Sequence, residues 1–234
     1  MIVAIQTARK GSKSVTNKNI LPIQDKPLFL HSIDNANNSS IIEKVFCSTD
    51  CELIKSYSST NNFQVIERPE SLSGDSASHH DTMIHAIHEV EKIGNRKIDL
   101  IVFLLGNTIS AKGHWIDACL RKMIVDDEID SIQSVSKFNM FNPYRAFRIT
   151  ADDRLKTIVD SEGIQNSNDK NAAGDVWFNN GSFFICRRDM VISKQGANPF
   201  PWLGYNILPF RESVKMEVDA PWQLDWLRKC YSEQ

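Results

Sequence analysis

This 234-residue chain lacks both long apolar runs and an excess of one charge. No apolar stretch approaches the roughly 18 residues of a membrane-spanning helix, and the apolar run at its start has no charged region before it, unlike a secretion signal. Lys and Arg number 27 against 29 Asp and Glu, a net charge of −2, which argues against general nucleic-acid binding. We therefore expect a protein that contacts neither a membrane nor a nucleic acid.

Cysteine is also sparse, with five scattered residues and no C-x-x-C pair. Cys47 and Cys51 stand four positions apart, but no second Cys/His pair completes a zinc site with them. Unpaired, scattered thiols are typical of a reducing compartment, so we expect a cytoplasmic protein. Internal repeats and low-complexity segments are missing too, and a composition with 41% hydrophobic residues suits one globular domain over 1–234.

The common glycine-rich phosphate fingerprints, G-x-x-x-x-G-K-[ST] and G-x-G-x-x-G, do not occur. Instead, an apolar run over 1–7 leads into a loop that contains Gly11, a small hydroxyl at Ser12 and several cations. A glycine lets backbone N–H groups approach an anion, and Arg and Lys neutralise it. The loop is therefore a candidate polyphosphate site, and the alternative is a solvated basic turn. Its cations are Arg9, Lys10, Lys13 and Lys18.

Strand-like runs alternate with helix-like patterns over the first 135 residues. Strands are expected at 44–48, 63–66, 99–105 and 131–135, and helices at 27–38, 51–60, 79–94 and 113–125. This alternation predicts an α/β fold, a three-layer sandwich with a mostly parallel sheet and helices on both faces. The loops that follow the strands then meet at one edge, where ligands bind.

The pattern changes after residue 138, where we expect a small projecting lobe. Short strands are expected at 145–149 and 154–159, around a polar loop over 160–175. Further strands are expected at 177–186 and 213–218, followed by a helix from Pro221.

Four constellations along the chain have both a structural and a functional interpretation. The triplet 48–50 at the end of a strand favours a helix cap by Asp50, and Ser78 with Asp81 resembles a capping box. Arg68 stands beside a proline on a loop and could donate to a base carbonyl. The histidines in 79–88 could be interpreted as metal ligands. However, His85 and His88 lie opposite the apolar stripe of the expected helix, which favours a solvated or subunit-contact face.

The fourth constellation is Glu217-Val218-Asp219. On a strand the two carboxylates would share one face, and such a pair can hold Mg²⁺ beside substrate phosphates. The alternative is an exposed edge with two acids.

Taken in order, these pieces resemble the acylneuraminate (CMP-sialic acid) cytidylyltransferases, a branch of the nucleotide-diphospho-sugar transferases. The resemblance covers essentially the whole chain and rests on short motifs in matching order. They are 8–13, Lys18-Asn19, 26–28, 48–50, Arg68-Pro69, Gly74-Asp75 with Ala77-Ser78, 142–146, Asn180-Gly181 and 217–219.

The resemblance implies transfer of CMP from CTP to a 2-keto-3-deoxy sugar acid with release of pyrophosphate. It implies that Arg9, Lys13 and Lys18 act on the triphosphate together with Ser12, with Asn19 nearby. It places Arg68, Ala77 and Ser78 at the cytosine and Arg145 near the sugar acid. Glu217 and Asp219 match the metal pair for Mg²⁺ or Mn²⁺. It also implies a homodimer, for which 138–180 is the candidate contact.

Departures from the family pattern bear on the acceptor. Gly106 stands where a glutamine commonly touches the acyl sugar, and Asn107 follows it. A missing amide would alter specificity, so we expect N-acetylneuraminic acid to be handled poorly, with Asn107 as a compensating amide for a related nonulosonic acid. The alternatives are a cytidylyltransferase for a phosphonate or sugar phosphate, and a non-catalytic binding module. The retained Arg9, Lys13, Lys18 and Asp219 argue against the latter.

Overall fold

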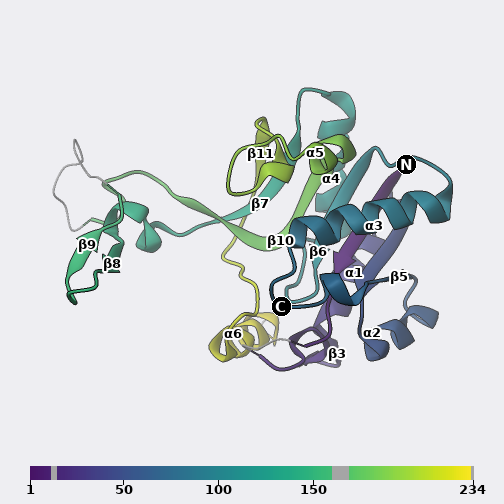
Figure 1. Ribbon diagram of the computed structural model, residues 1–234, viewed down its shortest axis with the longest axis horizontal. Coiled ribbons are helices and arrows are strands. Elements are labelled where there is room, and N and C mark those ends of the chain that lie inside the picture. Colours follow the sequence, from purple (N-terminus) through teal and green to yellow (C-terminus); the bar gives the residue numbers. More distant parts are fainter. Residues whose placement is uncertain (12–14, 160–168, 233–234) are drawn as a thin grey trace.

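The computed structural model of this chain describes residues 1–11, 15–159 and 169–232. Its centre is a seven-stranded sheet in the order β11-β7-β10-β6-β1-β4-β5 (Figure 1). Every neighbouring pair is parallel except the two that β10 makes. The strands are β1 (Ile2–Thr7), β4 (Lys44–Thr49), β5 (Gln64–Glu67), β6 (Leu100–Leu105), β7 (Ser131–Lys137), β10 (Trp177–Arg187) and β11 (Ile207–Glu212).

Helices cover both faces of this sheet, so the predicted three-layer sandwich is confirmed. The helices are α1 (Leu28–Asn37), α2 (Glu52–Ser56), α3 (His79–Gly94), α4 (Gly113–Val125), α5 (Arg188–Ser193) and α6 (Pro221–Ser232). One core packs Phe29 of α1 and Leu120 of α4 against Val102 of β6. The other packs Met83 of α3 and Val191 of α5 on the opposite face. Among the described residues, no helix is both long and apolar enough to cross a membrane.

A third, smaller core joins the two ends of the chain. It contains Ile23 of β2 (Pro22–Ile23), Leu28 at the start of α1, Val218, and Leu224 and Leu227 of α6. The hairpin of β2 with β3 (Lys26–Pro27) follows the basic loop. The loop and the acidic segment near residue 218 are therefore packed on one apolar base.

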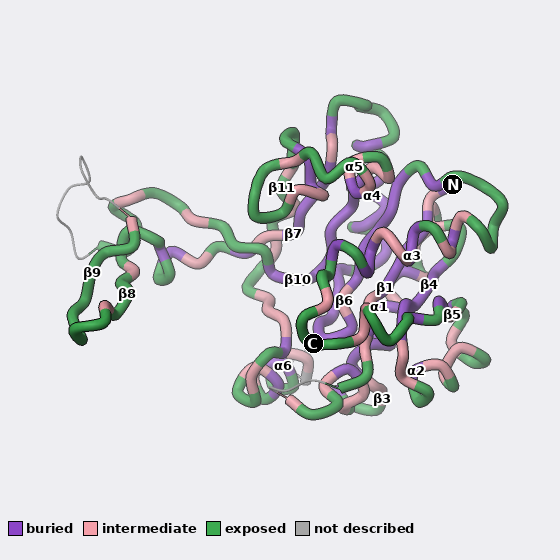
Figure 2. The backbone as a smooth tube through the Cα atoms, viewed as in Figure 1, coloured by how far each residue is buried: buried purple, intermediate pink, exposed green. Residues whose placement is uncertain are grey.

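The expected projecting lobe is present. Strands β7 and β10 run on from the sheet and carry a separate hairpin of β8 (Phe147–Ile149) and β9 (Leu155–Thr157), well away from the layers (Figure 1). Figure 2 shows that most of this lobe is exposed. Large apolar side chains lie on it with more than half of their surface exposed, namely Met140, Phe141, Phe147, Ile149, Leu155 and Ile158.

Most predicted strands and helices are confirmed, but the last strand was placed wrongly. The sequence favoured a strand at 213–218, whereas β11 ends at Glu212 and pairs with β7 over 207–212. Pro209 lacks an N–H and fits there because β11 is the edge strand. Residues 214–219 form no ladder. Helix α5 and η6 (Pro201–Leu203) were not predicted.

Candidate active site

The loops after three parallel strands meet at one edge of the sheet, as expected. The Ala8 N–H donates to Ser48 O at 3.1 Å, and the Gly106 N–H donates to Thr7 O at 3.0 Å. These bonds join the ends of β1, β4 and β6. Because parallel strands present their carboxyl ends on the same side, the basic loop and residues 106–108 form one continuous rim.

The basic loop begins with two residues that are bonded to neighbouring loops. The Lys10 N–H donates to Asp50 Oδ1 at 2.6 Å. The Arg9 guanidinium donates to Ser73 O at 3.2 Å and pairs with Asp75 at 2.6 Å, with about a third of its side chain exposed. Gly11 has a φ of 77°, the left-handed region that glycine tolerates. Ser12 and Lys13 lie outside the described residues.

Asp50 does not cap the helix that follows it, so that interpretation was wrong. The residue before α2 is Cys51, which makes no side-chain cap bond, and the Cys51 N–H is bonded to Thr49 Oγ1 instead. The Asp50 carboxylate is used to hold the backbone of the basic loop at Lys10. A carboxylate cannot be assigned to a local cap from sequence when a loop from another strand competes for it.

Arg68 lies at this rim but is largely enclosed. Its Nη2 donates to Ser48 O at 2.9 Å and its Nε to Ser48 Oγ at 3.3 Å. Burial lowers the pKa of Arg68, because desolvation disfavours the charged form. The side chain therefore fixes the end of β4, and its contact with a base stays a prediction.

Ala77 and Ser78 precede α3, whose N-terminus faces the same rim. Ser78 Oγ accepts a hydrogen bond from the Asp81 N–H at 3.2 Å, so the predicted cap is confirmed. The first residue of α3, His79, has its Nε2 3.2 Å from Thr7 Oγ1 at the end of β1. The apolar stripe of this helix is buried and His88 is exposed, as the sequence predicted, whereas His85 is half-buried and its Nδ1 is enclosed. Cytosine contacts of Ala77 and Ser78 stay predictions.

The acidic pair does come together with the basic loop. Lys18 Nζ lies 2.6 Å from Asp219 Oδ1, although 201 positions separate them in the sequence. Asn107 Nδ2 donates to Asp219 Oδ1 at 3.3 Å and to Glu217 Oε2 at 3.4 Å. Asn19 is buried nearby, and its amide donates to Arg9 O at 3.0 Å. Cations, amides and two carboxylates thus lie together at one rim of loops.

Glu217 is under electrostatic strain in this arrangement. Burial, and then the charge of Asp219, raise the pKa of Glu217, while Asn107 and Lys18 act in the opposite direction. The carboxylates of Glu217 and Asp219 both accept from the Asn107 amide, and their mutual repulsion is relieved by a positive charge beside them. Among the residues that the structure describes, no three His, Cys, Asp or Glu side chains gather as a metal site. A cation here would therefore have only two protein carboxylates.

Backbone contacts hold the two carboxylates in place without a strand. The Val218 N–H donates to Asn107 O at 2.8 Å, and Val218 is fully buried. The N–H groups of Asp219 and Ala220 donate to Gln223 Oε1 at 2.7 and 2.6 Å. With Val218 pointing into the core, both carboxylates contact Asn107, so their shared direction is confirmed although the strand is not.

Two glycines at the site have steric reasons to be glycine. A Cβ on Gly106 would lie 2.7 Å from Ala8 Cβ and 3.2 Å from Asn19 Cγ. Gly181 has a φ of 72°, and a Cβ there would lie 2.3 Å from Glu217 Cγ. Packing beneath the basic loop therefore explains Gly106 by itself, and its place in the acceptor pocket stays a prediction. Gly181 was visible in the sequence only as part of the Asn180-Gly181 motif.

Among the predicted site residues that the structure describes, Arg145 is the one that it does not bring to this rim. It ends η5 (Pro143–Arg145), a turn in the projecting lobe, which extends away from the sheet in Figure 1. Within one chain, Arg145 is therefore separated from Asn107, Glu217 and Asp219. Its role toward the acceptor stays a prediction.

Solved structures share this architecture. CMP:2-keto-3-deoxy-manno-octonic acid synthetase, solved with CTP, superposes with a TM-score of 0.71 over 99% of this chain and 98% of that one, at 19% identity. At that identity the likeness shows the fold alone.

Sequence comparison identifies the family of this chain. A profile of the family described as cytidylyltransferase matches residues 3–171, so the chain belongs to the cytidylyltransferase family. It is 40% identical over 86 residues to N-acylneuraminate cytidylyltransferase of Escherichia coli O18:K1:H7, which is 37% of this chain and 20% of that protein.

A second relative comes from Helicobacter pylori and is named pseudaminic acid cytidylyltransferase and UDP-2,4-diacetamido-2,4,6-trideoxy-beta-L-altropyranose hydrolase. It is 29% identical over 151 residues, 63% of this chain and 28% of that protein. The chain thus spans between a fifth and a third of the length of these two curated relatives.

Proposed function

We propose that this protein transfers CMP from CTP to a 2-keto-3-deoxy sugar acid, sialic acid or a related nonulosonic acid, and releases pyrophosphate. One observation carries the proposal: Lys18 and Asn107 converge with Glu217 and Asp219 at the rim that holds the basic loop. Family membership and relatives named for acylneuraminate and pseudaminic acid support the nucleotide and the class of acceptor.

In the proposed reaction the anomeric hydroxyl of the acceptor attacks the α-phosphorus of CTP. A new P–O bond forms, the bond from the α-phosphorus to the bridging oxygen breaks, and the hydroxyl proton passes to solvent. Little covalent work remains for side chains, so positioning and charge neutralisation dominate. Arg9, Lys13 and Lys18 would bind phosphate oxygens, with Ser12 and Asn19 donating beside them. Arg68, Ala77 and Ser78 would border the cytosine.

Magnesium or manganese fits the acidic pair on chemical grounds. Glu217 and Asp219 offer hard oxygen ligands, and the raised pKa of Glu217 indicates a place where positive charge is favourable. Two carboxylates plus substrate phosphates are a common way of holding Mg²⁺. We propose that Glu217 and Asp219 hold the ion, which when bound neutralises charge on the triphosphate. Lys18 would then turn from Asp219 to a phosphate.

We further propose a homodimer that forms through the lobe, the candidate contact at 138–180. The exposed apolar side chains of the lobe are what a second copy would cover. Arg145 lies on this lobe, so in such a dimer it would be offered to the partner's acceptor rather than to its own. For location we propose the cytoplasm, which suits five free thiols.

Pyrophosphate release tests the function directly. CTP, Mg²⁺ and each acceptor of a panel are mixed with the protein, and initial rates are compared. We expect release with one of the sialic, legionaminic, pseudaminic or octulosonic acids. Release only with a phosphonate or a sugar phosphate would support the alternative acceptor. No release with any acceptor, despite CTP binding, would support a binding module.

A further inference from the structure

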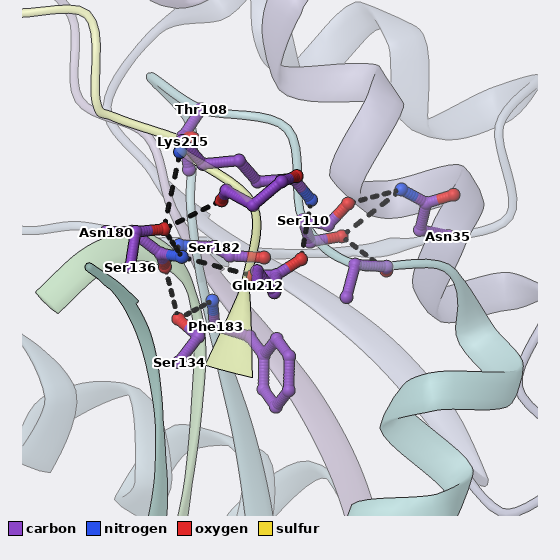
Figure 3. A network of polar contacts seen from close by, with 12 residues as sticks. Asn35, Thr108, Ser110, Ser134, Ser136, Asn180, Ser182, Phe183, Glu212 and Lys215 are labelled. Atoms are coloured by element: carbon purple, nitrogen blue, oxygen red, sulfur yellow. Dashed lines mark hydrogen bonds and ion pairs between the residues drawn. The ribbon is translucent and has the colours of Figure 1, made fainter. Parts of the chain in front are cut away.

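The segment between β11 and α6 carries both carboxylates yet has no ladder of its own. It runs from Ser213 to Ala220 without helix or strand. Its shape must come from other contacts, because eight unpaired residues would otherwise sample many conformations. The contacts near its start come from a buried polar cluster on β7, β10 and β11 (Figure 3).

Asn180 is the centre of this cluster. It is buried, and its Oδ1 accepts from Ser134 Oγ at 2.7 Å and from the Ser182 N–H at 3.0 Å. Its Nδ2 donates to Ser136 Oγ at 2.9 Å and to Glu212 Oε2 at 3.2 Å. The residue stands where the pairing of β10 with β7 is interrupted, between Asn179 and Phe184. One amide thus joins three strands.

Glu212 extends the cluster into the segment. Only 9% of its side chain is exposed, and Lys215 Nζ donates to its Oε1 at 2.8 Å. Ser136 Oγ donates to Ser213 O at 2.8 Å and lies 3.4 Å from the Lys215 N–H. A buried carboxylate is costly without partners, so Glu212 favours the conformation in which Lys215 folds back three residues onto it.

The fold-back lies close to the site along the chain. Lys215 precedes Glu217 by two residues, which span at most about 7 Å. Only Met216 separates Lys215 from Glu217, so a shift at Lys215 acts on Glu217 through a single residue. Downstream, Thr108 Oγ1 donates to Met216 O at 3.4 Å, so the next residue is fixed from the rim itself.

We propose that Asn180, Glu212 and Lys215 are positioning residues that hold the 213–219 segment so that Glu217 and Asp219 face Asn107 as a pair. The proposal rests on the proposed function, in which that pair holds the divalent ion. It extends that function to polar groups of the sheet that lie behind the two carboxylates along the chain.

Three variants test the cluster at different points. Lys215→Met removes the ammonium, Asn180→Asp replaces the two amide donors by a second carboxylate facing Glu212, and Ser136→Ala removes only a hydroxyl. Mn²⁺ affinity is measured by electron paramagnetic resonance with CTP and without acceptor, and kcat and the KM for CTP are measured separately. Circular dichroism and Tm report folding. If Asn180→Asp does not fold, the Mn²⁺ affinity of Ser136→Ala tests whether the cluster positions the two carboxylates.

We expect each variant to weaken Mn²⁺ binding by about 10- to 100-fold, the range for groups that orient metal ligands. The kcat should fall, while the KM for CTP should change less because cations of the basic loop hold the triphosphate. Adding Glu212→Gln to Asn180→Asp should restore most of the affinity, because the new amide donates to the new carboxylate.

Arg188→Met is the matched control, since Arg188 and Glu91 form a partly buried ion pair at 3.0 Å on the α3–α5 face. It should lower Tm and leave Mn²⁺ affinity and kcat unchanged. Folded Lys215→Met and Ser136→Ala that behave like this control would overturn the positioning role. If wild-type protein with CTP binds no Mn²⁺, or if Asp219→Asn binds it as well as wild type does, the proposed function fails instead.

Discussion

Replacing Gly181 by alanine should cost far more activity than stability. The φ of 72° at this position destabilises the folded state of an alanine variant by about 1–2 kcal/mol. The lower conformational entropy of its unfolded chain offsets about 0.4–1 kcal/mol of that loss. A net loss of about 1 kcal/mol corresponds to a fall in Tm of roughly 2–4 °C for a chain of this size.

The effect on the site is larger, because the new Cβ would lie 2.3 Å from Glu217 Cγ. Glu217 has to move by about 1 Å to reach an ordinary contact distance, and a misplacement of that size can reduce a rate by about 10²-fold. Rotation of the Glu217 side chain relieves the clash more easily than movement of β10. We therefore expect kcat to fall by about 10²-fold while the fold is kept.

Gly174→Ala provides the control for backbone strain. Gly174 also has a positive φ, 83°, but nothing lies within 4 Å of its Cβ position. It should show a comparable loss of Tm with unchanged pyrophosphate release at saturating CTP. A Gly181→Ala enzyme with the kcat of Gly174→Ala would refute the steric argument. In the Glu217→Ala background, Gly181→Ala should add no further loss, because the group it displaces is gone.

Three further predictions concern the charged groups of the rim. Arg9→Ala should reduce kcat/KM by at least about 10²-fold, roughly 3 kcal/mol, with little change in Tm; near-normal pyrophosphate release would rule out its phosphate role. Asp219→Asn should abolish Mg²⁺-dependent turnover and Glu217→Gln should weaken it, and full wild-type activity in EDTA would exclude the metal role. Because the pKa of Glu217 is raised, the metal-free protein should lose stability as pH rises from the ordinary value of about 4.3 through the raised one. Urea unfolding in EDTA between pH 4 and 7 should show this slope in wild type and a smaller one in Glu217→Gln, and equal slopes would contradict it.

The sequence predicted the elements that are determined by local pattern. Apolar runs such as that of β6 are buried on both faces, and their length and flanking turns identify them without any partner. The stripe of α3 likewise follows from helical spacing. Because parallel strands end at one edge, the rim with Arg9, Lys18 and Asn107 could be placed before any contact was known.

Contacts between distant segments could not be predicted in this way. Residues 213–218 were expected to form a strand, but Ser136, more than seventy positions earlier, bonds to the backbone of Ser213 and Lys215 instead. Asp50 has a suitable position for a helix cap and bonds to Lys10 instead. Nothing local to Gly181 indicates that Glu217 packs on it. In each case the residue has several possible contact partners, and the local sequence does not indicate which one it contacts in the fold.

The ion pair between Lys18 and Asp219 also bears on the order in which the protein is made. The chain leaves the ribosome from its amino end, so the basic loop and most of the sheet are exposed before β11 and α6 exist. Contacts of such long sequence separation close late and slowly. Until then, Val15, Leu21 and Ile23 lack the apolar cover that Val218, Leu224 and Leu227 provide. A nascent chain therefore holds the cationic half of the rim without the acidic half, and the two halves meet only when the segment before α6 has docked.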